Sequence, residues 1–303
     1  MASTPKAFPP LRIHEPTSKH THTIILLHGR GSSGNDFAEE FFSSESSAKK
    51  SLPSRFPNLR WVFPSSRELW STAFQENMPA WFEAHSLTDI YSRCELQKTG
   101  LMESVEYLRG VIEHEIQVLN GASEKLLLGG ISQGAATGLW ALLRLGHPIG
   151  GFVGASAWLP FSKYIMHRAG STAETDERDQ SASDDAQSFV DEMLGSTLPT
   201  TSDRSLSGEL TLTPVLMGHG SDDAYVDIEL GREVQTTLQH IGFEIEWKEY
   251  SGADEEGHWL KEPEQVDDIS AFIQRAIGLV ETTSSKPSTD QSINSELSGP
   301  SSN

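Results

Sequence analysis

Short apolar runs alternate with amphipathic segments through the middle of the chain. Runs such as IILL and LLLG are apolar at every position instead of every second one. This pattern is typical of strands that are covered on both faces of a sheet. It predicts the strands Thr23–Leu27, Arg60–Phe63, Lys125–Gly129, Gly151–Ala155, Pro214–Met217 and Glu244–Tyr250.

Helical periodicity fills the intervals between these runs. The clearest case is a stripe at steps of 4, 3, 4, 4 and 3, formed by Leu101, Val105, Leu108, Ile112, Ile116 and Leu119. Further helices are expected at Gln133–Leu145, Asp227–Ile241 and Pro263–Leu279, with Pro263 suited to a helix start. Strands and helices in alternation predict one α/β domain, with a mostly parallel sheet and helices on both of its faces.

Composition sets the expected limits of that domain, which we place at residues 22–280 after an N-terminal extension, 1–21. Residues 170–209 are acidic and rich in Ser and Thr, so they indicate a mostly disordered insertion in which only FVDEML is apolar enough to dock. Residues 281–303 carry 8 serines in 23 positions and little that could be buried. They indicate a disordered, solvated tail.

Charge, the length of apolar runs and the cysteine count together limit the classes of protein to which the chain can belong. The chain has 23 Lys and Arg against 43 Asp and Glu, a net charge of −20, and no basic run, which disfavours nucleic acid as a partner. No apolar run approaches the roughly 18 to 20 residues of a membrane span, and the first twenty residues lack a secretory signal. The single cysteine, Cys94, excludes an internal disulfide. We therefore expect a cytoplasmic protein.

A candidate nucleophile lies in the sequence LLLGGISQGAATG, where Ser132 is the centre of a G-x-S-x-G pattern. Chance alone gives that pattern roughly a quarter of the time in a chain of this composition, so its context decides. Here the serine directly follows a predicted strand and opens a predicted helix. A sharp strand-to-helix turn of this kind exposes a nucleophilic hydroxyl. The alternative is a Gly/Ser turn without chemistry.

A serine hydroxyl needs a base, and the base needs a third group to orient it. In this fold the chain order is Ser, Asp, His. Asp222 and Asp223 come just past a predicted strand, and His258 lies between a strand and a helix. Loops at one edge of a parallel sheet converge, so we expect these side chains near Ser132. The alternative for His258 is an exposed loop histidine.

Backbone donors for an oxyanion are the remaining requirement. The glycine-flanked turn after the first predicted strand is suited to aim the Arg30 N–H at the site, and the Gln133 N–H follows the serine. Neither donor needs its side chain. The alternative is an ordinary β-turn.

Other histidines have different interpretations. His28 and His219 each end an apolar strand and precede a glycine, which favours buried, turn-stabilising roles. His20 and His22 are two positions apart but lack further ligands, so no metal site is expected. No cofactor is expected either.

Together these residues resemble the acyl-protein thioesterases and their relatives among the phospholipase/carboxylesterases. The resemblance rests on LLHGRGSSGNDF, NMPAWFE, GISQGAA, SAWLP, HGSDDAYV and the loop that holds His258, which occur in family order from about residue 22 to 278. By position it implies Ser132 as nucleophile, Asp223 as triad acid and His258 as base. It assigns the oxyanion donors to Arg30 and Gln133.

The family implies a compact cytosolic α/β-hydrolase that cleaves thioesters or esters of long acyl chains, with S-acylated proteins or acyl-ester lipids as partners and transient contact with a membrane surface. Four features depart from its pattern: Ala135 in place of a glycine, the acidic loop ADEEGHW around the histidine, Trp259 directly after the histidine, and the long insertion. An apolar acyl-binding wall has four candidates, for which core packing is an equal alternative: Trp81, Phe82, Trp158 and Leu159.

Two other functions stay open. The same machinery would serve a carboxylesterase or lysophospholipase that acts on small-molecule or lipid esters. A non-catalytic hydrolase-fold binding protein is the rival of a different class, although such proteins often lack one triad member, and here all three are present in the sequence.

Overall fold

The structure, a computed structural model, describes residues 7–170, 180–195 and 209–278. For residues 180–184 it describes the backbone helix alone. Disorder was expected for the tail at 281–303 and for most of the insertion at 170–209. The tail, and residues 171–179 and 196–208 of the insertion, lie outside the described ranges.

Seven strands form one sheet in the described part of the chain, and its centre is made of the apolar runs seen in the sequence. In spatial order the strands are β1 (Arg12–His14), β3 (Leu59–Phe63), β2 (His22–Leu27), β6 (Leu126–Ile131), β7 (Gly151–Ala155), β8 (Val215–Gly220) and β9 (Ile245–Tyr250). All neighbours pair in parallel except β1, which is antiparallel to β3. All six predicted strands are present. The sheet also begins earlier than expected, because β1 lies inside the segment taken as an N-terminal extension.

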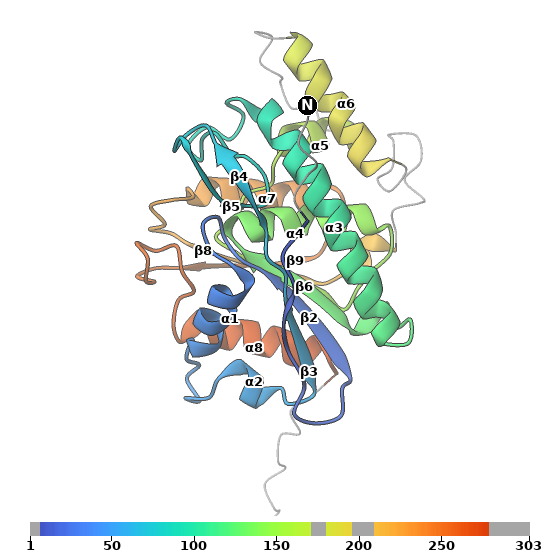
Figure 1. Cartoon of the computed structure of the whole chain (residues 1–303), viewed down its shortest axis with the longest axis vertical. Helices are drawn as coiled ribbons and strands as arrows, with labels where there is room; N and C mark the ends of the chain where they lie inside the picture. The colour runs from blue at the N-terminus through green and yellow to red at the C-terminus, as the bar shows by residue number, and fades with distance from the viewer. Residues whose placement is uncertain (1–6, 171–179, 196–208, 279–303) are drawn as a thin grey trace, which may run out of the picture.

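Helices cover both faces of this sheet, as predicted (Figure 1). Alternate residues of β2 enter different cores: Ile25 and Leu27 join one, while Ile24 and Leu26 join the other. The first core is closed by α3 (Gln97–Val118), α4 (Ser132–Leu145) and α7 (Ile228–His240), and the second by α1 (Gly34–Ser43) and α8 (Glu264–Ala276). A strand whose side chains are buried on both faces has to be apolar throughout, which is why these runs do not alternate.

A β-hairpin, β4 (Arg67–Ser71) with β5 (Glu76–Ala80), forms a separate two-stranded sheet that the sequence did not predict. Its residues are mostly partly or fully exposed, so they lack the apolar run that marks a central strand. Trp70 in β4 is 50% exposed and Phe74 in the turn is 54% exposed. Three helices, α1, α2 (Leu52–Arg55) and α5 (Ser162–Arg168), were also not predicted.

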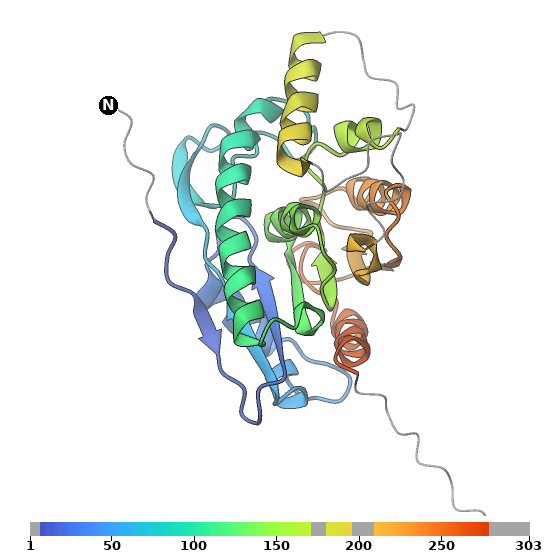
Figure 2. The same cartoon turned by 90° about the vertical axis from the view of Figure 1, so that its right-hand side faces the viewer.

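The insertion contributes a helix, α6 (Gln180–Leu194), that packs on α5 and α4 at one end of the molecule (Figures 1 and 2). Its buried residues fall within or just before the FVDEML stretch that was expected to dock: Ala186, Phe189, Val190, Met193 and Leu194. The ring of Phe189 lies 4.7 Å from that of Phe161, and Asp191 pairs with Arg168 at 2.8 Å.

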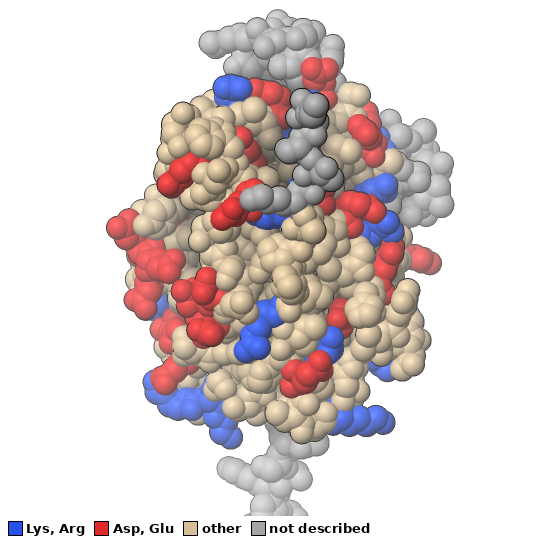
Figure 3. All heavy atoms as spheres, viewed as in Figure 1, with Lys and Arg blue, Asp and Glu red and all other residues tan. Residues whose placement is uncertain are grey.

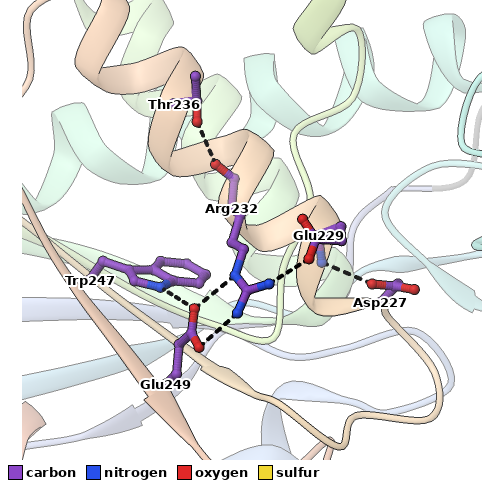
Figure 4. Close-up of polar contacts among 6 residues, drawn as sticks. All are labelled: Asp227, Glu229, Arg232, Thr236, Trp247 and Glu249. Atoms are coloured by element: carbon purple, nitrogen blue, oxygen red, sulfur yellow. Dashed lines mark hydrogen bonds and ion pairs between the residues drawn. The ribbon is translucent and has the colours of Figure 1, made fainter.

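A polar network joins α7 to the edge strand β9 (Figure 4). Arg232 donates to both carboxylate oxygens of Glu249, each at 2.9 Å, and the Trp247 Nε1–H donates to the same carboxylate. Asp227 caps the helix by accepting from the Glu229 N–H at 2.9 Å. The loop before α7 carries Asp223 and the loop after β9 carries His258, so the network joins the two elements from which these loops extend.

Candidate active site

Ser132 stands at the turn from β6 into α4, in a left-handed backbone conformation with φ of 54°. Such a conformation is strained for a residue with a side chain and is typical of a nucleophile elbow. The glycines beside it permit close packing, since a Cβ on Gly134 would lie 2.4 Å from the backbone oxygens of Leu27 and His28. The elbow therefore presses against the end of β2.

Asp223 and His258 come together from the loops after β8 and β9. The His258 Nδ1–H donates to Asp223 Oδ2 at 2.8 Å, and Asp223 Oδ1 accepts from the backbone N–H groups of Tyr225 and Val226 at 2.9 Å each. Burial opposes the charge on Asp223, but the hydrogen bonds from His219 and His258 hold the pKa of its carboxyl well below its usual range. Because Nδ1 carries the proton, Nε2 of His258 is left to accept one.

His219 and Asp222 support the two loops. His219 is buried, as predicted, and its Nε2 lies 2.8 Å from the Val226 carbonyl oxygen and 3.4 Å from Asp223 Oδ2. Asp222 points elsewhere: its Oδ2 accepts from the Gly252 N–H at 2.8 Å and from the Ser251 hydroxyl at 3.3 Å. The two adjacent aspartates therefore have different partners.

The two expected oxyanion donors belong to rigid segments. The side chain of Gln133 is buried and accepts from the Trp81 N–H at 2.9 Å while donating to the Phe82 carbonyl oxygen at 2.8 Å. Its backbone N–H is in the first turn of α4, where no helical partner exists. The loop of Arg30 is fixed by a 2.8 Å bond from the Gly31 N–H to the Pro79 carbonyl oxygen.

His28, which directly precedes this loop, is buried, as the sequence indicated. Its Nδ1–H donates to the Gly29 carbonyl oxygen at 2.7 Å, and its Nε2 accepts from the Ser66 N–H at 2.9 Å. This arrangement requires the neutral imidazole. Burial lowers the pKa of His28 to about 4, against the opposing effect of the Gly29 carbonyl.

We expect the folded protein to lose stability as the pH falls because of His28. Unfolded, this side chain takes up a proton near pH 6.5, whereas in the fold it stays neutral down to about pH 4, so its contribution is complete above 6.5 and declines below it. Between pH 7 and 5 the linkage amounts to about 2 kcal/mol. Urea unfolding of the wild type and of His28→Gln at both pH values measures it. An equal loss of stability in the two proteins would contradict the neutral state of His28.

Ser132 and His258 line one open pocket of about 740 Å³. Of the four residues proposed for an apolar wall, Trp158 lines it, whereas Trp81, Phe82 and Leu159 are core residues that do not. The apolar lining comes mainly from residues that sequence reasoning missed: Phe37, Phe74, Met78, Leu87, Ile131, Tyr225 and Trp259. Phe37, Met78, Ile131 and Tyr225 fall inside quoted motifs, but only the fold shows that they line the pocket of the serine.

One flank of the pocket is acidic. Asp36 and Glu40 come from α1, and Glu255 and Glu256 precede the histidine. Burial raises the pKa of Glu40, and the negative charges of Glu255 and Asp36 add to this effect. Figure 3 shows acidic side chains gathered on the flank where Figure 1 shows α1 and β8. None of the lining residues belongs to α6, so the described part of the insertion does not line the pocket.

The described ranges contain neither a group of metal ligands nor a membrane-spanning helix. There, no three His, Cys, Asp or Glu side chains are grouped so as to hold a metal ion. No helix in these ranges combines the length and the apolar character that crossing a bilayer requires.

Solved structures share this fold. Arabidopsis thaliana SOBER1 is 25% identical, with a TM-score of 0.59 over 85% of this chain and 99% of its own. Zea mays acyl-protein thioesterase 2 is 21% identical, with a TM-score of 0.62 over 89% of this chain and 99% of its own. The chain is an α/β-hydrolase by fold.

Sequence comparisons narrow that class. A family model described as phospholipase/carboxylesterase matches residues 9–187, more than half of the chain. Acyl-protein thioesterase 1 of Gibberella zeae is 28% identical, and the match covers 86% of this chain and 92% of that protein. A probable carboxylesterase of Oryza sativa is also 28% identical, and the match covers 80% of this chain and 73% of that protein. The chain belongs to the phospholipase/carboxylesterase family, as the motifs suggested, and is a hydrolase of the thioesterase and carboxylesterase type.

Proposed function

We propose that this protein is a serine hydrolase that cleaves long-chain acyl thioesters or esters through an acyl-enzyme on Ser132. The observation that carries the proposal is a left-handed Ser132 at the end of β6 that shares a pocket with His258, which is itself bonded to Asp223 at 2.8 Å. The similarity to acyl-protein thioesterases favours S-acylated proteins as substrates. The single cysteine suits a cytoplasmic enzyme.

In the first step, Ser132 Oγ attacks the carbonyl carbon while Nε2 of His258 takes the hydroxyl proton. Asp223 keeps the Nδ1–H in place and stabilises the imidazolium that forms. The N–H groups of Arg30 and Gln133 donate to the developing oxyanion. When the tetrahedral intermediate collapses, His258 returns the proton to the thiolate or alkoxide that leaves.

In the second step, a water molecule replaces the leaving group beside His258. The histidine removes a proton from this water, which attacks the acyl carbon and forms a second oxyanion on the same two donors. Breakdown of this intermediate releases the carboxylic acid, and the proton returns to Ser132 Oγ. No cofactor takes part in either step.

The geometry also orients the substrate. Because His258 protonates the leaving group, that group has to lie on the side of the histidine loop, which is the acidic flank. The acyl chain then runs the other way, toward the apolar side chains Phe74, Met78, Leu87 and Trp158. Burial of a long chain there supplies binding free energy that increases with its length.

A matched series of acyl thioesters and p-nitrophenyl esters, kept below their micelle limits, tests this function. Each methylene buried in an apolar groove contributes about 0.8 kcal/mol, so we expect kcat/KM to rise roughly fourfold per carbon over short to medium chains. The thioesters and esters should show the same trend. A preference that peaks at acetyl or butyryl would favour the small-molecule carboxylesterase instead.

A further inference from the structure

The side chain of Arg30 has no part in the mechanism, which uses only its backbone N–H. The residue nevertheless lines the catalytic pocket and is half-buried. Nη1 donates to the Ala84 carbonyl oxygen at 3.3 Å, and Cζ lies 4.9 Å from the centre of the Phe74 ring. The side chain thus spans from the oxyanion loop to the hairpin turn and to the segment that follows β5.

A second, small cavity of about 10 Å³ lies under the hairpin. Its polar wall residues, apart from Arg30, are Ser71 and Glu83, whose Oε1 accepts from the Thr72 N–H at 2.6 Å. The other walls are apolar and come from β4, β5 and the residues that follow: Leu69, Trp70, Ala80, Phe82 and Ala84. Arg30 and Met78 line this cavity and also the catalytic pocket. These two side chains therefore form the partition between the two spaces.

The partition lies on the acyl side of the site. In the proposed orientation the leaving group occupies the side of His258 and the acyl chain runs toward Phe74 and Met78, which line the same pocket. An apolar chain of increasing length approaches the guanidinium, and burial already lowers the pKa of Arg30. Contact with methylenes would remove further water from a charge that has no carboxylate partner among the ion pairs found in the described residues.

We propose that Arg30, together with Met78, closes the acyl pocket and is a specificity-determining residue that sets the chain length at which catalytic efficiency stops rising. This inference rests on the proposed function. Chains up to the partition gain from each carbon. Longer ones have to displace the guanidinium from Ala84 and Phe74, because the cavity behind it, at about 10 Å³, has no room for further methylenes.

The test is the acyl series extended to long chains, measured for the wild type, Arg30→Met and Met78→Ala. In the wild type, kcat/KM rises and then stops at a particular carbon. In Arg30→Met the stop moves to longer chains. The ratio of kcat/KM for a chain two carbons beyond the wild-type stop to that for a chain at the stop therefore increases about 15-fold, which is roughly fourfold for each of the two carbons. Met78→Ala, which keeps the guanidinium, shifts the stop in the same direction by a smaller amount.

Leu87→Ala is the matched control, because Leu87 lines the catalytic pocket but not the cavity under the hairpin. This variant should lower the gain per carbon without moving the stop. All comparisons are ratios within one variant, so they do not depend on a general loss of activity, and thermal melting confirms that each protein is folded.

Three results would overturn the role of Arg30 while leaving the proposed function intact. One is a wild-type series that rises without a stop, and another is a stop at the same carbon in Arg30→Met and Met78→Ala. The third is a preference of the wild type, lost in Arg30→Met, for chains that end in a carboxylate, since the guanidinium would then bind the chain end. A series that does not rise with chain length contradicts the proposed function itself.

Discussion

Ser132→Ala is expected to lower kcat for ester and thioester hydrolysis by about 10⁴-fold or more, the size of effect seen when a triad nucleophile is removed. In the proposed mechanism the acyl group is bonded to Ser132 Oγ, and no other group takes over this role when the hydroxyl is removed. Ser132 lies at the pocket wall with 8% of its surface exposed, which is sufficient for a small electrophile to reach it. A fluorophosphonate probe followed by peptide mapping should label the wild type at Ser132 and leave the variant unlabelled.

Ser156 offers a matched control for this experiment. It too is buried and has a positive φ, of 49°, but it lies after β7 and does not line the pocket. Ser156→Ala should therefore keep kcat within tenfold of the wild type and keep the label. Hydrolysis by Ser132→Ala within tenfold of the wild type would contradict the assignment. A folded wild type that neither turns over esters nor takes the label would favour a non-catalytic binding protein.

Asp223→Asn is expected to lower kcat by roughly 10³- to 10⁴-fold. The carboxylate accepts the Nδ1–H of His258 at 2.8 Å, and an amide in its place stabilises the wrong tautomer of the imidazole. The charge that compensates the imidazolium is lost as well. Steady-state kinetics across neutral pH measures the effect, and circular dichroism verifies that the variant is folded.

Asp222→Asn is the neighbouring control. Its carboxylate binds Gly252 and Ser251 at the start of the histidine loop and makes no recorded contact with His258. We expect it to change kcat by less than tenfold and to act mainly on stability. If Asp222→Asn proved the more damaging substitution, the assignment of the triad acid would be off by one residue.

The order of elements was open to prediction because it depends on local patterns. The central strands are buried on both faces, so their sequences are apolar at every position, and the long helix α3 carries a single apolar stripe. Other strands were not predicted, for the opposite reason. The strand β1 and the hairpin β4–β5 are partly exposed, and their residues are only weakly patterned.

The candidate site also has one part that the sequence predicted and another that needed the tertiary structure. The turn at Ser132 was visible because a strand, two glycines and a helix are contiguous in the sequence. The candidate acid, Asp223, and the candidate base, His258, were proposed from chain order and family motifs. Their hydrogen bond, however, joins residues 35 positions apart, and the choice between Asp222 and Asp223 rested on the resemblance until the loop geometry distinguished them.

The sequence by itself determined the candidate residues for the chemistry, because side-chain type and local backbone conformation are properties of short segments. It identified the elbow serine, the buried histidines and the apolar strands. Only the tertiary structure decided which aromatic residues face the serine, since Trp81 and Trp158 are equally buried yet only Trp158 lines the pocket. It likewise decided that Arg30 extends to the hairpin. Such orientations depend on how distant elements pack, and no local pattern records them.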